Sequence, residues 1–308
     1  MTEAVDWPAV DVVVPTRDRP ELLREAIAAI LAQDYTGDVR VIVVHDQSEP
    51  DHSVAVDDPH RGVVVISNAR RTGLAGTRNT GILASDRPLI AFCDDDDAWL
   101  PGKLQRQVEV LHNDPDAEFV CIGIRVKYAD GTHDRILEQY EITLSDLLRD
   151  RLTELHPSGF LMRREALVDG FGLVEEDIPG SYAEDYEFLL RAARRTPIRN
   201  VPDVGVQVLW SQRSYFTARW ATIVTALEWL LDRYPEFQQV PAGEARVSGQ
   251  IAFASAAQGE RREAVRWARH TLRCNPAEPR AYLALTVATG AVSADTVLKR
   301  LHAVGKGI

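Results

Sequence analysis

The chain has 308 residues, of which 45% are hydrophobic and 26% charged, so it is long enough for one large domain or a domain with an appendage. Its formal net charge of −11 argues against a general nucleic-acid-binding protein. The N-terminus, MTEAVDWP, lacks the basic and apolar regions of a signal peptide, and no run approaches the roughly 18 apolar residues that span a bilayer. We therefore expect a soluble, cytoplasmic protein. Its three scattered cysteines, Cys93, Cys121 and Cys274, form no CxxC pair and are expected to be reduced core residues, not a disulfide frame or a zinc site.

The first 126 residues alternate between apolar runs and segments with helical spacing. Helices are predicted over residues 20–33, with Asp18 as the N-cap, and over residues 76–84. Five apolar runs predict buried strands, at residues 10–15, 39–44, 62–66, 89–93 and 119–126. This order predicts an α/β fold with a mostly parallel sheet, covered by helices on both faces.

After about residue 217 only helical patterns remain. Helices are predicted over residues 220–234, 244–257, 260–274 and 279–289. We therefore expect two regions, an α/β domain over residues 1–217 and a small all-α region over residues 218–308. Residues 250–276 resemble a tetratricopeptide hairpin, which cannot bury its own face alone. These helices are expected to hold an acceptor or to pair two subunits.

Four consecutive aspartates directly follow the buried run 89–93: Asp94, Asp95, Asp96 and Asp97. We call these four residues the acid run. Side by side the four carboxylates repel one another, and they are tolerable if a divalent cation lies between them. Mg²⁺ and Mn²⁺ prefer such oxygen ligands. In an extended chain Asp94 and Asp96 would point to the same side.

Polar residues also follow the first two predicted strands, namely Thr16, Arg17 and Asp18 after the first and His45, Asp46 and Gln47 after the second. In parallel sheets, ligands bind beyond the carboxyl ends of the strands. The acid run is therefore expected to share one binding site with these two clusters.

Five sequence blocks, in this order, resemble the family-2 glycosyltransferases of GT-A fold. They are VVVPTRDRPELLREAIAAILAQDY, VIVVHDQS, RRTGLAGTRNTGILAS, LIAFCDDDDAWLPGKL, and PSGFLMRREAL followed by SYAEDYEFLLRAAR. The resemblance covers residues 10–195. It implies an inverting, metal-dependent transferase that moves a sugar from a nucleotide-sugar donor, most simply a UDP-sugar, to a hydroxyl acceptor. The acceptor class stays open between polysaccharide, lipid-linked glycan, peptide and small natural product.

The resemblance also implies roles for individual residues. Thr16 and Arg17 match the nucleotide pocket, and Asp46 matches the acid that accepts a hydrogen bond from the base. Arg78 matches a basic residue near the diphosphate. Asp94 and Asp96 match the metal-holding DXD pair, with Asp95 as a further donor contact.

The later motif implies that Asp185 is the catalytic base and that Glu184 supports it. Arg213 lies in a stretch where such enzymes often have a loop over the donor, so it is expected either to reach the diphosphate or to lie on a surface loop. The sequence departs from relatives at Arg71-Thr72-Gly73, where an asparagine often precedes the glycine. Two other functions stay open, a sugar nucleotidyltransferase and a non-catalytic sugar-nucleotide-binding scaffold. The sequence PTRDRPE lacks the glycine-rich loop that the first of these normally needs.

Overall fold

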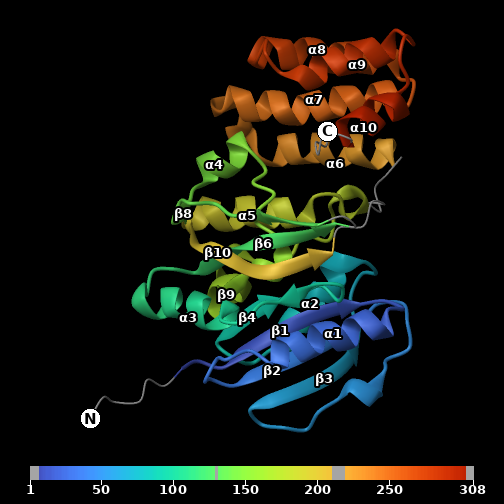
Figure 1. Ribbon diagram of the computed structural model, residues 1–308. Coiled ribbons are helices and arrows are strands. Elements are labelled where there is room, and N and C mark those ends of the chain that lie inside the picture. The colour runs from blue at the N-terminus through green and yellow to red at the C-terminus, as the bar shows by residue number, and fades with distance from the viewer. Residues whose placement is uncertain (1–6, 129–130, 210–218, 303–308) are drawn as a thin grey trace. The chain divides into compact units, whose positions relative to one another are not determined.

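The computed structural model describes residues 7–128, 131–209 and 219–302 (Figure 1). The chain divides into two compact units. The first, here the sheet unit, comprises residues 1–144, 152–176 and 184–212. The second, the helical unit, comprises residues 145–151, 177–183 and 213–308. The expected boundary at residue 217 lies outside the described residues and stays a prediction.

The sheet unit contains a mixed ten-stranded sheet with the strand order β3-β2-β1-β4-β9-β6-β10-β5, to which β7 and β8 add at β6 and β10. The strands are β1 Val10–Thr16, β2 Val39–His45, β3 Arg61–Ser67, β4 Leu89–Phe92, β5 Ala98–Trp99, β6 Phe119–Tyr128, β7 Gly131–Arg135, β8 Glu141–Ile142, β9 Leu161–Arg163 and β10 Ile198–Leu209. The expected α/β fold is confirmed. Strands β3, β2, β1 and β4 are parallel, as are β6 and β10, whereas β9, β5, β7 and β8 pair antiparallel to their neighbours.

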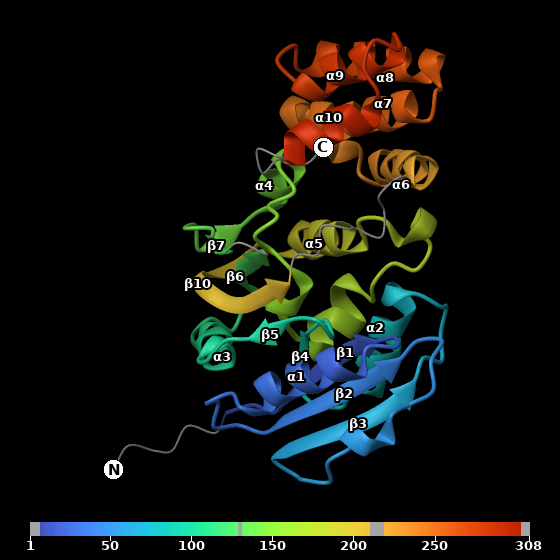
Figure 2. The ribbon, with the colours of Figure 1, turned by 45° about the vertical axis from the view of Figure 1, so that its right-hand side comes forward.

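Helices cover both faces of this sheet. Side chains alternate between the faces along each strand, so successive apolar residues pack against helices on opposite sides. The helices are α1 Pro20–Leu31, α2 Leu74–Ala84, α3 Lys103–Asn113 and α5 Glu184–Arg195. Val12 and Val14 of β1 pack in one core with residues of α1 and α3, such as Ile27 and Leu104. Val13 faces α2 instead, and α1 and α2 lie on opposite sides of β1 (Figure 2). Helix α1 follows β1 and helix α2 follows β3, so the loop before each helix lies at the carboxyl end of a strand.

Two details of the expected helices differ in the structure. The N-cap of α1 is Arg19, which makes no side-chain capping bond, so the cap predicted at Asp18 is wrong. Asp18 instead has a left-handed backbone with φ 53°. Helix α2 begins at Leu74, two residues before the predicted start, with Gly73 as its N-cap. Gly76 is required there, because a Cβ at this position would lie 1.9 Å from the Arg71 carbonyl oxygen.

The helical unit consists mainly of α6 Trp220–Arg233, α7 Pro241–Ala257, α8 Arg261–Cys274, α9 Pro279–Ala288 and α10 Ala294–His302, with α4 Leu144–Arg149 contributing most of its residues. The expected hairpin is present as α7 and α8, which lie side by side (Figure 1). The small residues that pack between its helices and α9 are fully or almost fully buried: Ala252, Ala256, Ala264 and Ala268. Gly259 supplies the turn with φ 86°. Within the described ranges, no helix has the length and apolarity that crossing a membrane requires.

Candidate active site

The acid run forms a tight turn between β4 and β5. The Asp97 amide donates to the Asp94 carbonyl at 3.2 Å, which closes the turn. The run is therefore not extended, and the expected alternation of Asp94 and Asp96 to one side does not follow. Each carboxylate instead meets a partner from another part of the sheet unit.

Asp95 and Asp96 face the loop that follows β1. Thr16 Oγ1 donates to Asp95 at 2.7 Å, and Arg19 Nη1 donates to Asp95 at 3.1 Å and to Asp96 at 2.7 Å. Burial raises the pKa of Asp95, against the lowering effects of Thr16 and Arg19. Of the residues predicted after β1, Thr16 contacts the acid run, whereas the exposed Arg17 pairs with Asp18, with Nε 3.9 Å from Oδ2.

Asp94 is paired with a buried arginine on α2. Arg78 is 2% exposed, and its Nη2 donates to Asp94 Oδ1 at 2.6 Å. Its Nη1 donates to Glu184 Oε1 at 3.3 Å, while its Nε has no hydrogen-bond partner among the described residues. Burial lowers the pKa of Arg78, but Asp94 and Glu184, followed by Asp185, outweigh it, so the pKa is raised. This guanidinium thus joins the acid run to the first turn of α5.

Asp97, the last residue of the run, is almost completely buried. Ser158 Oγ donates to its Oδ2 at 2.5 Å and accepts from the Asp94 amide at 2.9 Å. His156 Nδ1 lies 3.4 Å from the same carboxylate oxygen. Burial raises the pKa of Asp97 to about 7, with His156 opposing the shift and Asp94 adding to it. Ser158 therefore fixes both ends of the turn.

Asp46 follows β2 and holds the loop before α2. Its carboxylate accepts from the Asn68 side chain at 2.9 Å and from the Gly73 amide at 3.0 Å. Gln47 next to it has a left-handed backbone with φ 53°. Left-handed non-glycine residues often mark functional sites. The departure at residues 71–73 thus falls in a loop that Asp46 anchors.

Glu184 and Asp185 begin α5. Acidic side chains are favoured at this position, because the helix dipole is positive there. Glu184 is buried against Arg78, whereas Asp185 is half-buried and lies within electrostatic reach of the same guanidinium. The preceding residue, Ala183, has φ 64°. The pair thus stands at the start of a helix whose entry is tightly bent.

The oxygen-rich part of this site fits Mn²⁺ or Mg²⁺. Ligand atoms of Asp94, Asp97 and His156 lie within 4.8 Å of one another. The predicted pair, Asp94 and Asp96, is more exposed, with side chains 22% and 33% exposed against 2% for Asp97. The four carboxylates of the acid run contact two arginines, Arg19 and Arg78, and lie near one histidine, His156. The negative charges outnumber the arginines, and this excess favours a bound cation. Arg213 lies outside the described residues.

Four residues of this site are not among the predicted catalytic, donor-binding or metal residues: Arg19, Asp97, His156 and Ser158. Arg19 stands in the TRDRP stretch, where a second cation beside Arg17 was the available signal. No spacing rule links Ser158 to an aspartate 61 residues away.

The model of "Glycosyl transferase family 2" matches residues 11–171. An uncharacterized glycosyltransferase of Bacillus subtilis, YwdF, is 26% identical over 202 residues, which cover 64% of this chain and 72% of that protein. A GalNAc(5)-diNAcBac-PP-undecaprenol beta-1,3-glucosyltransferase of Campylobacter jejuni is 34% identical over 101 residues, or 32% of each chain. Apart from YwdF, the alignments with seven further curated relatives span 32–62% of those proteins' lengths.

Solved structures share the fold. S. aureus TarS 1–349 in complex with UDP-GlcNAc has a TM-score of 0.60 at 15% identity, covering 92% of this chain and 91% of that one. The mannosyltransferase PcManGT from Pyrobaculum calidifontis, in complex with GDP-Man and Mn²⁺, has a TM-score of 0.55 at 19% identity, covering 94% and 81%. The family model matches more than half of the chain, from β1 through the acid run to beyond Ser158. The chain therefore belongs to glycosyl transferase family 2 and is a glycosyltransferase by class.

Proposed function

We propose that this enzyme transfers a sugar from a UDP-sugar to a hydroxyl acceptor, with inversion at the anomeric carbon and with a divalent cation. The observation that carries the proposal is the buried Arg78 bridge. It ties Asp94, in the acid run, to Glu184, which adjoins Asp185 at the start of α5. One bridge thus holds a cation-binding element next to a carboxylate suited to take a proton.

The acid run would hold Mn²⁺ or Mg²⁺ through Asp94 and Asp96, the pair that reaches solvent. When bound, the cation would supply positive charge beside the departing diphosphate. Arg19 is half-exposed and adds a fixed positive charge at the same edge of the sheet. The buried Asp97, which contacts Ser158 and His156, stabilises the turn of the acid run.

Asp185 would act on the acceptor. A sugar hydroxyl is a weak nucleophile, so a carboxylate must take its proton while it attacks the anomeric carbon. Glu184 is tied to Arg78, so it orients the start of α5 and leaves Asp185 as the base. Attack opposite the departing diphosphate inverts the anomeric carbon, and no covalent sugar–enzyme intermediate is needed.

Asp46 would select the base of the nucleotide. A carboxylate only accepts hydrogen bonds, and uracil offers an N–H donor. S. aureus TarS has been solved with UDP-GlcNAc and PcManGT with GDP-Man, so we propose a direct comparison of these two donor classes. A thermal-shift screen of UDP- and GDP-sugars with Mn²⁺ should show stabilisation by UDP-sugars, since a ligand of the native state raises stability. Stabilisation by GDP-sugars alone would overturn the uracil assignment.

The catalytic assignment is tested with Asp185→Asn. Transfer to an acceptor should fall by about 10²–10⁴-fold, the usual value of base assistance, while donor affinity measured by calorimetry stays unchanged. Asp134→Asn is the matched control, because Asp134 is an exposed acid paired with Arg125. Near wild-type turnover of Asp185→Asn would refute the base. A product with retained anomeric configuration by NMR would refute inversion.

A further inference from the structure

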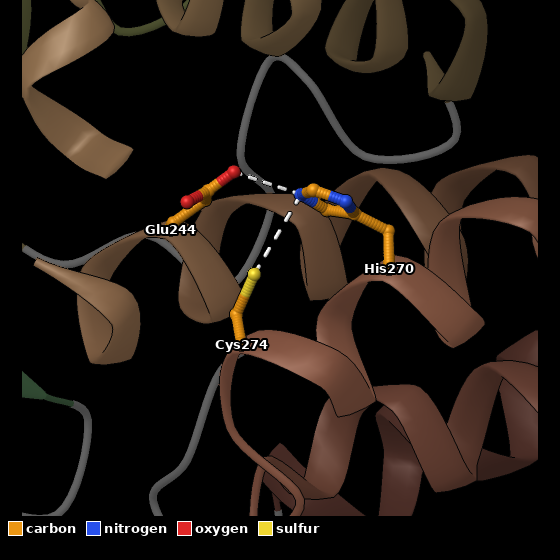
Figure 3. Close-up of side chains that lie close together, drawn as sticks. All are labelled: Glu244, His270 and Cys274. Carbon is orange, nitrogen blue, oxygen red and sulfur yellow. Dashed lines mark hydrogen bonds and ion pairs between the residues drawn. The ribbon is translucent and has the colours of Figure 1, made fainter. Parts of the chain in front are cut away.

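Three side chains of different chemistry converge in the helical unit, separate from the residues of the candidate active site. Glu244 lies on α7, and His270 and Cys274 lie on α8 (Figure 3). His270 Nε2 is 2.8 Å from Glu244 Oε1, and Cys274 Sγ is 3.7 Å from the same imidazole nitrogen. One ligand atom from each residue lies within 4.8 Å of the other two.

The helices hold this arrangement in place. His270 and Cys274 are four residues apart, so they share one face of α8. Helix α7 packs on α8 at the buried residues Ala252 and Ala268, and Ser248 Oγ lies 2.9 Å from Thr271 Oγ1 between them. Glu244 is therefore presented to α8 by a packed interface, so the trio is already assembled when a ligand arrives.

A thiolate, an imidazole and a carboxylate form a typical donor set for zinc. Zn²⁺ takes sulfur, nitrogen and oxygen ligands in a tetrahedral arrangement, whereas Mg²⁺ and Ca²⁺ prefer oxygen alone. We propose that Glu244, His270 and Cys274 bind a Zn²⁺ ion that links α7 to α8. Nearby Arg266 is paired with Glu263 at 2.6 Å, so its charge is balanced before a cation enters.

Three protein ligands leave the fourth tetrahedral position for water or another ligand. A pocket of about 380 Å³ adjoins the trio, and Glu244 and His270 both line it. Trp267 and Arg273 also line this pocket. The fourth position is thus reachable from solvent, consistent with a His270 side chain that is 40% exposed.

The site is tested by loading the metal-free 308-residue protein with Co²⁺ and with Zn²⁺. Co²⁺ should give a thiolate-to-metal charge-transfer band, and Zn²⁺ should bind in competition with a chromophoric chelator. Cys274→Ser should remove the band. Cys274→Ser, His270→Gln and Glu244→Gln should each weaken Zn²⁺ binding at least about 10-fold, because even residues around a metal's ligands contribute that much.

His60→Gln is the matched control. His60 Nδ1 lies 2.7 Å from Asp38, so it forms an imidazole–carboxylate pair without a thiol. This variant should bind Zn²⁺ like the wild type. Metal held only by the acid run would give no thiolate band, so binding without that band overturns the proposal.

A second measurement needs no variant. Cys93 and Cys121 are fully buried, so Cys274 is the cysteine expected to react with an alkylating reagent in the native protein. Zn²⁺ should slow that reaction, because the thiolate that attacks the reagent would be held by the metal, and a chelator should restore it. An unchanged alkylation rate at saturating Zn²⁺ would refute the site. Because neither readout depends on sugar transfer, this result is independent of the proposed function.

Discussion

Arg78 Nη2 lies 2.6 Å from Asp94 Oδ1, in a pair whose arginine is shielded from solvent. The same guanidinium reaches Glu184, so two carboxylates depend on one cation. A planar guanidinium bridges two acceptors, whereas a lysine ammonium is a point charge on a flexible stem. The bridge therefore requires arginine, and charge alone does not suffice.

Arg78→Lys keeps the charge but is expected to lose one of the two carboxylate contacts. We expect the free energy of unfolding to fall by about 1–3 kcal/mol, because a buried acid loses its charged hydrogen bond. Transfer should fall more steeply than donor binding, since α5 is no longer tied to the acid run. Urea unfolding and steady-state kinetics measure the two effects.

The control is Arg70→Lys. Arg70 pairs with Glu176 but is 40% exposed, so the change should cost no more than about 1 kcal/mol. Equal losses in the two variants would show that the Arg78 bridge behaves as an ordinary surface pair.

Ser158→Ala removes the hydroxyl that joins Asp97 to the Asp94 amide. The buried carboxylate loses a 2.5 Å hydrogen bond, so stability should fall by about 1–3 kcal/mol. The turn of the acid run should loosen as well, so the Mn²⁺ concentration for half-maximal transfer should rise. Ser248→Ala, another buried hydroxyl, should lower stability without moving that concentration. An unchanged Mn²⁺ requirement in Ser158→Ala would argue against the positioning role.

The sequence predicted the strands that are continuous apolar runs, and it predicted that polar clusters follow them. It did not predict β10, because Pro202 and Gly205 interrupt the pattern. The structure accommodates both residues through register shifts between β10 and β6, at Val201/Val204 and Val204/Val206. Strand β10 is stabilised by pairing with β5, β6 and β8, and this pairing cannot be read from the local sequence pattern.

The specific pairings of the acid run were not predicted, although Thr16 and Arg78 were both expected at the same site. Arg78 and Ser158 lie 16 and 64 residues from Asp94, and such distances obey no periodicity. The extended-chain argument for Asp94 and Asp96 failed because one backbone hydrogen bond, Asp97 to Asp94, closes a turn. The residue types of a cation site were readable in sequence, whereas the direction of each carboxylate depended on tertiary contacts.

Asp11, the single charge in an otherwise apolar strand, is explained by a buried ion pair. Its carboxylate is fully buried and accepts two 2.8 Å hydrogen bonds from Arg40 and one of 2.6 Å from Ser85. Asp11→Asn should lower the free energy of unfolding by about 1–3 kcal/mol, because the Arg40 guanidinium loses its buried charged partner and keeps only the exposed Asp86. Asp11 and Thr16 stand at opposite ends of β1, roughly 17 Å apart, so turnover per folded molecule should be unchanged. Thermal unfolding and active-site titration measure both.

Asp86→Asn is the control for this pair, since Asp86 contacts the same arginine but its side chain is 81% exposed. The loss there should stay below about 1 kcal/mol. A loss of several kcal/mol from Asp86→Asn would show that Arg40 stabilises the fold through Asp86 and not through Asp11.

Lys103 gives the fold a pH dependence of its own. Its ammonium is fully buried, lies 3.7 Å from the centroid of the Trp99 ring and donates to Gln107 at 2.7 Å. Burial lowers the pKa of Lys103 to about 7. An unfolded lysine titrates near 10.4, so between these values the unfolded chain binds a proton that the folded chain does not. The contribution of Lys103 to stability therefore rises with pH across this window, by up to about 1.4 kcal/mol per pH unit.

Lys103→Met should remove this slope. The gain in stability over the wild type should be largest at pH 7 and shrink toward pH 9, because folding of the wild type releases the proton of Lys103 and this release costs less free energy as pH rises. Other titrating groups cancel in the difference between the two proteins. Urea unfolding at pH 7, 8 and 9 measures it, with the exposed Lys127→Met as the control that should show no such trend. A difference that stays constant over this range would mean that Lys103 remains protonated in the folded state, held by Gln107 and the face of Trp99.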